Sequence, residues 1–128
     1  MRLLLDTHIL LWSALEPERL SNAARIAIED AENGVYVSAA SAWEIAIKQS
    51  LGKLELDRPA EHWLLEVLRK SGFEAIDVSV ASALRVRALP WHHRDPFDRL
   101  LIAQALEENL TLVTHDAKLA VYGVPLFG

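Results

Sequence analysis

The sequence contains no cysteine, which excludes disulfide bonds and thiolate metal sites and is typical of an intracellular protein. It also has no apolar run that approaches the roughly 18 residues of a membrane-spanning helix. The N-terminal stretch Met1–Leu5 meets Asp6 at once and lacks the small-residue cleavage site of a secretory signal. These absences together predict a cytoplasmic protein without a membrane partner.

Several motifs that identify enzyme classes are missing as well. There is no Walker phosphate-binding loop, no Gly-x-Gly-x-x-Gly dinucleotide fingerprint and no Gly-x-Ser-x-Gly nucleophile elbow. The five histidines show no zinc-binding spacing such as HExxH. Basic residues are outnumbered, 13 against 18 acids, so the net charge of −5 does not indicate a strongly basic nucleic-acid binder. An enzyme that holds its substrate through a bound metal can nevertheless be acidic.

Apolar residues are abundant in this chain. The 128 residues are 52% hydrophobic, which is high for a soluble domain. The length predicts a single domain over residues 1–128 that buries a proper core. The apolar excess predicts in addition that another chain covers part of the surface, and we expect a homodimer or a tight complex with a partner.

Short strands alternate with helices along the whole chain. Strands are predicted at Arg2–Leu5, Val35–Val37, Phe73–Val78 and Leu110–Val113, and helices at His8–Leu15, Asn22–Asn33, Ala39–Leu51, Pro59–Ser71, Ser79–Leu89, Asp95–Glu108 and Asp116–Val121. Ser21 and Ser38 are the expected N-caps of two of these helices, and Gly34 is an expected helix stop. The alternation predicts a three-layer α/β/α sandwich around a mostly parallel sheet.

Four acidic residues lie where predicted strands give way to predicted helices, namely Asp6, Glu44, Asp98 and Asp116. Parallel strands deliver their carboxyl ends to one edge of the sheet, where ligands characteristically bind. Carboxylates that crowd there need a compensating cation, and oxygen ligands suit Mg²⁺ or Mn²⁺. We therefore predict metal-dependent chemistry on phosphate, with one or two ions and with Asp6 and Asp98 as the central ligands.

Three of these acids also have a structural explanation at the start of a helix. Asp6 and Asp116 stand where N-caps are expected, because aspartate accepts hydrogen bonds from the free amides of a first helical turn. Asp95 is the better cap for the helix that contains Asp98, which leaves Asp98 for chemistry. Independent caps need not converge on one edge of the sheet, so the shared position of the acids favours a common site.

Glu44 has a different structural explanation. With Ser41 it matches a capping box, although Ser38 directly follows the strand and is the better cap. If Ser38 is the cap, Glu44 projects from the second turn without a capping role. Lys48 lies one turn further on, a spacing typical of a solvated surface pair.

These residues fall in stretches that resemble the PIN-domain ribonucleases, specifically the VapC-type toxins of bacterial and archaeal toxin–antitoxin pairs. The matching stretches are Leu4–His8, Ser41–Ile45 with Lys48, Gly52–Leu54, His93–Ala103 and Leu112–Asp116. They cover nearly the whole chain in family order. The block Asp95-Pro96-Phe97-Asp98-Arg99, together with its correctly ordered companions, is the most specific part of the resemblance.

The resemblance implies a PIN-like sandwich in which four acids form the catalytic and metal-binding quartet, namely Asp6, Glu44, Asp98 and Asp116. It implies Mg²⁺ or Mn²⁺ as the cofactor and an endoribonuclease that hydrolyses single-stranded or structured RNA, whether tRNA, rRNA or mRNA. It also implies inhibition by a cognate antitoxin protein, and family members commonly form homodimers.

Further residues beside the quartet are expected to assist it. Thr7, Thr114 and Asp95 are candidates to support the ligands by hydrogen bonding to a carboxylate or to a coordinated water. The candidate contacts to the RNA backbone are Lys48, Lys53, Arg94 and Arg99, each of which a solvated surface position also explains. His92 and His93 are expected in a polar loop that approaches the site.

Two other functions compete with the nuclease hypothesis. A metal-binding phospho-acceptor signalling module requires adjacent acids after the first strand, where this chain has Asp6-Thr7. A catalytically inactive PIN-like binding subunit would leave four intact acids unexplained. The four tryptophans, Trp12, Trp43, Trp63 and Trp91, either line a groove for an antitoxin helix or pack in the core.

Overall fold

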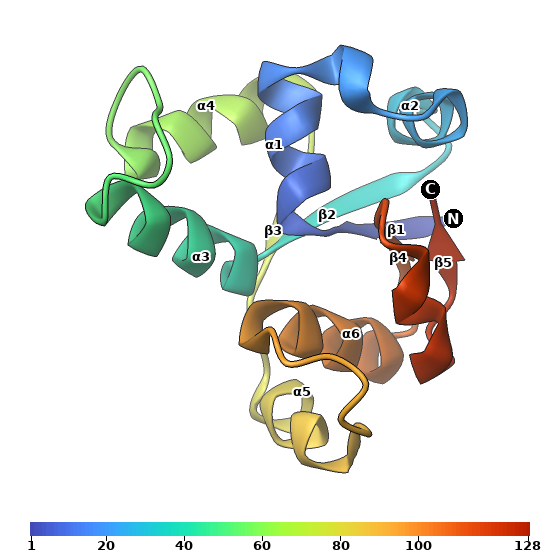
Figure 1. The fold of residues 1–128 in the computed structure, drawn as a ribbon. Coiled ribbons are helices and arrows are strands. Elements are labelled where there is room, and N and C mark those ends of the chain that lie inside the picture. Colours follow the sequence, from blue (N-terminus) through green and yellow to red (C-terminus); the bar gives the residue numbers. More distant parts are fainter.

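The computed structural model describes residues 1–128 and is built around a five-stranded sheet in which every pairing is parallel (Figure 1). The strands are β1 (Arg2–Leu5), β2 (Gly34–Ser38), β3 (Glu74–Ile76), β4 (Thr111–Val113) and β5 (Leu126–Phe127), in the order β3-β2-β1-β4-β5. Strand β1 is central, because Leu3 pairs with Val35 of β2 on one side and with Thr111 of β4 on the other. The predicted parallel sheet is confirmed.

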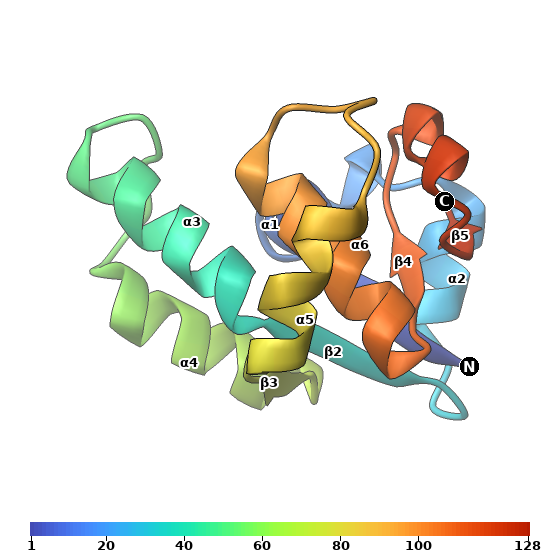
Figure 2. The same ribbon diagram turned by 90° about the horizontal axis from the view of Figure 1, so that it is seen from below.

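Helices cover both faces of this sheet. They are α1 (Thr7–Leu15), α2 (Asn22–Glu29), α3 (Ala39–Ser50), α4 (Ala60–Ser71), α5 (Val80–Arg85) and α6 (Pro96–Glu108), with short 3₁₀ helices η1 (Pro17–Arg19), η2 (Val86–Ala88) and η3 (Ala117–Tyr122). Figures 1 and 2 show α5 and α6 on one side of the sheet and α1, α2 and α4 on the other. This arrangement confirms the three-layer α/β/α sandwich. None of the helices combines the length and the apolar character that crossing a bilayer requires.

Alternation along β1 explains why two cores form. Leu3 and Leu5 join the cluster beneath α1 to α4, whereas Leu4 joins the cluster beneath α6, and all three side chains are fully buried. Successive side chains of a strand point to opposite faces, so an uninterrupted apolar run indicates a strand covered on both sides. The first five residues therefore place Asp6 at the carboxyl end of the most deeply buried strand.

Most of the predicted helix starts are confirmed by capping hydrogen bonds. The Ser38 hydroxyl accepts from the Ala40 amide at 3.0 Å, and the Ser21 hydroxyl accepts from the Ala24 amide at 3.0 Å. Asp95 caps α6, with Pro96 in its first turn. These caps form because the side-chain oxygen satisfies an amide that has no partner within the helix.

The end of the second helix was expected at Asn33, and this expectation is wrong. Helix α2 ends at Glu29, and the Asn33 side chain donates to the carbonyl of Ala27 at 2.9 Å, which closes the turn that follows. Gly34 does not stop a helix but begins β2, where its amide donates to the carbonyl of Met1 at 2.9 Å. A Cβ at Gly34 would lie 3.1 Å from the Tyr36 side chain, a close contact that the tyrosine would have to relieve by moving a few tenths of an ångström.

The C-terminal segment also differs from expectation. The helix predicted at Asp116–Val121 is a 3₁₀ helix with Asp116 as its N-cap. No strand was predicted beyond Leu110–Val113, yet Leu126–Phe127 forms the edge strand β5, paired in parallel with β4. A run of two residues is too short to show the alternation that marks a strand, so the pairing depends on β4 being available.

Arg99 occupies an unexpected place in the core beneath α6. Its side chain is 2% exposed, and its guanidinium donates to the carbonyls of Pro90 at 2.8 Å, Leu89 at 3.1 Å and Val86 at 3.2 Å. The guanidinium carbon also lies 3.8 Å from the centre of the Trp91 ring. The expected contact of Arg99 with RNA phosphate is therefore wrong, and so is a solvated surface position. Arg99 instead fixes the loop between α5 and α6.

We expect Arg99→Met to lower the free energy of unfolding by about 2–4 kcal/mol, because several buried carbonyls lose a charged donor at once. Arg94→Ala is the matched control: Arg94 lies in the loop that Arg99 contacts but is exposed, so its replacement should change stability by less than about 0.5 kcal/mol. Urea unfolding followed by circular dichroism measures both. Equal stability of the two variants would contradict a structural role for Arg99.

Candidate active site

The acidic residues lie at the point where the connections of the sheet diverge. From β1 the chain runs through β2 to β3 on one side, and it later returns to β4 and β5 on the other. In open α/β sheets the crevice at such a switch point, outside the carboxyl ends of the strands, is the usual ligand site. Asp6 follows β1 directly, and Asp116 lies three residues beyond the end of β4.

Asp6 combines a structural role with an unfavourable charge. Its Oδ1 accepts from the Ile9 amide at 2.8 Å and caps α1, and the side chain is buried. Burial raises the pKa of Asp6, although hydrogen bonding by Thr114 and the charges of His8 and His115 oppose the rise. The expected cap is present, and it engages only one of the two carboxylate oxygens.

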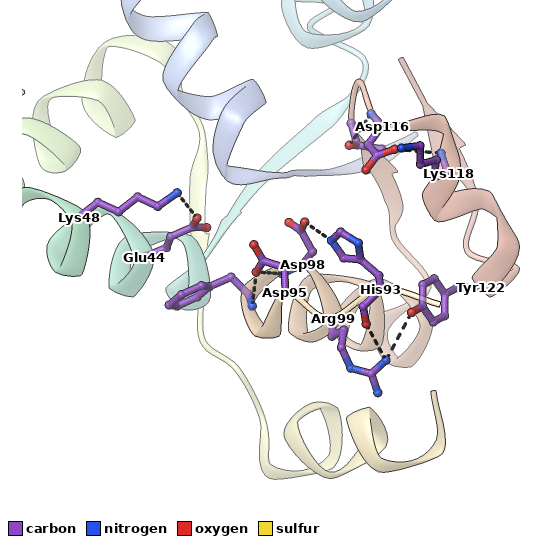
Figure 3. Close-up of polar contacts among 11 residues, drawn as sticks. Glu44, Lys48, His93, Asp95, Asp98, Arg99, Asp116, Lys118 and Tyr122 are labelled. Atoms are coloured by element: carbon purple, nitrogen blue, oxygen red, sulfur yellow. Dashed lines mark hydrogen bonds and ion pairs between the residues drawn. The ribbon is translucent and has the colours of Figure 1, made fainter. Parts of the chain in front are cut away.

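Asp98 projects from the first turn of α6 toward the same crevice. Burial raises the pKa of its carboxyl, and the neighbouring charges of Asp95 and Asp6 raise it further. The mutual effect of Asp6 and Asp98 shows that two acids 92 positions apart lie close enough to repel each other. The His93 ring, with Nε2 at 2.8 Å from Oδ2 of Asp98, lowers the pKa in opposition (Figure 3).

Glu44 stands on the second turn of α3, without a capping role, because Ser38 is the cap. Its carboxylate is buried, and Oε2 forms an ion pair with Nζ of Lys48 at 2.7 Å. The expected solvated surface pair is therefore wrong in one respect: the lysine is 37% exposed, whereas the glutamate side chain is only 5% exposed. Figure 3 shows this pair at the α3 side of the crevice.

Asp116 borders the crevice on the opposite side from Glu44 (Figure 3). It is half-buried, its carboxylate accepts from the Lys118 amide at 3.0 Å, and its own amide donates to Oγ1 of Thr114 at 3.1 Å. Asp116 thus caps η3, as the structural explanation expected. Figure 3 places Asp98 between Asp116 and Glu44 at this edge of the sheet.

No three of these acids lie close enough together to form a preformed binding site for one metal ion. Two of them hold a cationic or proton-bearing group: Glu44 holds Lys48, and Asp98 holds His93. The donor set still fits a hard divalent cation, because it consists of carboxylate oxygens, because burial raises the pKa of Asp6 and Asp98, and because neighbouring acids raise that of Asp98 further. A divalent ion would relieve the repulsion that these pKa directions record.

The expected supporting residues take up distinct positions. Thr114 hydrogen-bonds the Asp6 carboxyl and accepts from the Asp116 amide, so it links two of the four acids. Asp95 accepts from the amides of Phe97 at 2.8 Å and Asp98 at 3.2 Å. Thr7 contacts no acid in this way; its hydroxyl donates to the buried Ser41 hydroxyl at 3.0 Å and ties α1 to α3.

The candidate RNA-contacting residues separate into three kinds. Lys48 lies at the crevice and is engaged with Glu44, while Lys53 and Arg94 are exposed. Arg99 is withdrawn into the core, as described above. The sequence had placed His93 in a loop near the site but had not paired it with Asp98. His93 and Asp98 are only five residues apart in the matching stretch His93–Ala103, and this short separation could have suggested the pair.

Comparisons with known proteins agree with this architecture. The PIN domain, as a family, matches residues 3–124. Ribonuclease VapC22 of Mycobacterium tuberculosis is 37% identical over 123 residues, which cover 95% of this chain and 92% of that protein. VapBC2 from Rickettsia felis, solved bound to a DNA fragment from its promoter, superposes with a TM-score of 0.74 at 18% identity over the full length of both chains.

A second solved structure, DNA-bound VapBC from Salmonella typhimurium, gives a TM-score of 0.66 at 16% identity and covers 98% of this chain and 96% of that chain. At such identities the superpositions establish the fold, whereas the 37% identity over almost the whole chain establishes the closer relationship. Both findings set aside the phospho-acceptor signalling module. This chain belongs to the PIN-domain family and, within it, to the VapC-type ribonucleases.

Proposed function

We propose that this protein is the toxin of a type II toxin–antitoxin pair and that it hydrolyses RNA phosphodiester bonds with Mg²⁺ or Mn²⁺ held by Asp6, Glu44, Asp98 and Asp116. The observation that carries the proposal is the crowding of Asp6 and Asp98, whose pKa values are raised at the switch point of a VapC-type fold. An inactive binding subunit would have no need to maintain this unfavourable charge.

Some side chains of the site would bind the cation, and others would orient the side chains that bind it. Asp6 and Asp98 provide the central carboxylates, and Glu44 and Asp116 lie on opposite sides of Asp98 (Figure 3). These residues would hold a divalent ion, whose chemistry there would be to activate water and to neutralise charge on the phosphate oxygens. Thr114 keeps Asp6 and Asp116 in register, while the bond between His93 and Asp98 fixes one carboxylate.

Lys48 has a second use in this scheme. Its ammonium group neutralises Glu44 in the structure described here, and at 37% exposure it is accessible at the crevice. A phosphate group that enters the crevice meets an otherwise acidic surface, so a lysine at its edge favours the approach of the RNA backbone. Lys53 and Arg94, both exposed, extend the set of candidate backbone contacts.

We also propose a cognate antitoxin that docks on the groove between α3 and α4. This groove has a volume of about 670 Å³ and is lined mainly by apolar side chains, including Ile45, Leu64, Leu65 and Leu68. Its dimensions and composition suit the apolar face of an amphipathic helix. Helix α3 also carries Glu44, so an occupant of the groove contacts an element of the site.

None of the four tryptophans lines this groove. Trp63 is buried in the core, as ordinary packing predicts, and Trp12 is half-buried. Trp43 and Trp91 are 60% and 76% exposed, so core packing does not describe them. Trp43 instead meets the Phe97 ring edge-on, with the ring centres 5.2 Å apart, beside the acidic crevice.

The homodimer remains a proposal, and the outer face of α5 supports it. Val80 and Leu84 are one helical turn apart and are 75% and 70% exposed. Trp91, in the loop between α5 and α6, is also exposed on this side of the molecule. Figure 2 shows α5 in front of α6, at the surface of its layer. Apolar residues grouped in this way mark an interaction surface.

Asp98→Asn should reduce RNA cleavage by at least about 100-fold, because several kcal/mol of transition-state stabilisation depend on the bound cation. Excess EDTA should abolish cleavage by the unaltered protein, and Mn²⁺ should restore it. The measurement is cleavage of a labelled single-stranded RNA. Asp57→Asn, at an exposed acid outside the crevice, is the control and should remain active. Undiminished cleavage by Asp98→Asn, or in EDTA, would refute the proposal.

In the absence of metal, Asp6→Asn should raise the melting temperature at pH 7. A raised folded-state pKa means that the ionised carboxylate is less favourable in the folded than in the unfolded chain, so the acid costs stability at neutral pH. This penalty fades as the pH falls toward the ordinary value of 3.8, and the difference between the two proteins should shrink there. Asparagine caps a helix about as well as aspartate, so capping does not account for the change.

Thermal melts in EDTA and in Mg²⁺ measure this effect. Added Mg²⁺ should stabilise the unaltered protein more than Asp6→Asn, because the variant has lost a ligand. If Asp6 served only as a cap, the two proteins would melt together in EDTA and respond equally to Mg²⁺.

Leu84→Glu should convert a dimer into monomers, because a charge placed on the apolar face of α5 would be desolvated in the interface. Light scattering after size-exclusion chromatography measures the mass. Ile26→Glu is the matched control, since Ile26 is 67% exposed on α2, in the opposite helical layer. A monomeric unaltered protein, or equal dissociation of both variants, would contradict the proposed α5 interface.

A further inference from the structure

A cluster of aromatic side chains lies beside the acidic crevice and is not used by it. Trp12 of α1 and His115, between β4 and η3, have their ring centres 4.7 Å apart at an angle of 44°. His8, one turn before Trp12, meets His115 edge-on with the ring centres 5.7 Å apart. The guanidinium of Arg19 lies 4.5 Å from the centre of the Trp12 ring. We call His8, Trp12 and His115 the aromatic platform.

The platform adjoins the site on two sides in the chain. His8 follows Asp6 by two residues, and His115 immediately precedes Asp116. Charge on either imidazole acts on the Asp6 carboxyl, which shows that both rings lie near it in space. A group that stacks on these rings is thus next to any phosphate held at the acids.

Hydrogen bonding within the protein does not account for the two histidines. Both are exposed, and neither imidazole forms a hydrogen bond within the chain. Trp12 is half-buried because one part of it packs against the core cluster beneath α1. Together the three side chains present π surfaces and polar ring edges to solvent, which is the character of surfaces that receive unpaired nucleobases.

The negative net charge of the protein gives the aromatic platform a role in RNA binding. The chain carries a net charge of −5, and four carboxylates line the crevice, so attraction between surface charges and phosphate is weak. Stacking does not depend on net charge, since every nucleobase has a π face. It therefore supplies affinity for RNA that the electrostatics of this acidic protein do not provide.

We propose that His8, Trp12 and His115 stack on unpaired nucleobases of the RNA substrate next to the phosphodiester bond held at the acids. The guanidinium of Arg19 packs on one part of the Trp12 ring and adds its own planar surface, on which a base can also stack. This inference rests on the proposed ribonuclease function and adds to it the surface that positions the strand. It also favours single-stranded RNA, because paired bases do not offer their faces.

Binding can be measured without cleavage in the Asp98→Asn background. The probe is a fluorescein-labelled oligoadenylate RNA of about twelve nucleotides, which lies within the usual site size for single strands, with fluorescence anisotropy as the readout. Trp12→Leu and His115→Ala should each raise the Kd by roughly ten-fold. His62→Ala is the matched control, an exposed histidine on α4, and should leave the Kd unchanged.

A second probe separates stacking from backbone contact. An oligonucleotide of equal length with abasic positions retains the phosphates but has no bases to stack. All four proteins, the background and its three variants, should bind it equally, and the background should bind it about as weakly as Trp12→Leu binds oligoadenylate. If the variants weaken binding of both probes alike, the residues contact the backbone or support the fold, and the platform is refuted.

Folding and function have separate readouts. Circular dichroism shows whether Trp12→Leu folds; if it does not, the exposed-site variants His8→Ala and His115→Ala decide the question. Unchanged binding of oligoadenylate by these variants, while the unaltered protein still cleaves RNA with Mn²⁺, would overturn the platform alone. Failure of the unaltered protein to cleave RNA would overturn the proposed function instead.

Discussion

The mutual repulsion of carboxylates at the carboxyl edge of the sheet is the constraint on which the site depends. Asp6 stands at the end of the fully buried strand β1, and Asp98 opens the helix that packs beneath it. Burial raises the pKa of both acids, and the charges of Asp95 and Asp6 raise that of Asp98 further, which costs stability unless a cation is present. A fold that keeps these buried acids is less stable than one without them, and the acids are retained because the site needs them.

Much of the remaining structure serves to hold these acids in place. The Ser38 cap turns Glu44 into the crevice, and the hydroxyl pair of Thr7 and Ser41 ties α1 to α3. Arg99 fastens the loop between α5 and α6 by donating to its carbonyls, and that loop carries His93 to Asp98. Arg99, the arginine of the block Asp95-Pro96-Phe97-Asp98-Arg99, thus stabilises the loop by binding its backbone carbonyls and does not contact a phosphate.

Local sequence patterns were sufficient for the framework. The apolar run that ends at Asp6, the serine and aspartate caps, and the alternation of strands and helices each depend on neighbouring residues, and the parallel sandwich follows from them. The boundaries that failed depend on distant partners. Gly34 begins a strand because Met1 accepts its amide, and the last strand exists because β4 offers an open edge.

The sequence by itself determined which acids follow which strands, and the resemblance of its ordered blocks identified the family. Only the tertiary structure decided how each side chain is used. It buried Arg99, paired Glu44 with Lys48 and brought His115 against Trp12 across 103 positions of the chain. Burial and contact between remote segments depend on what packs from the opposite side, and no local pattern in one sequence records that.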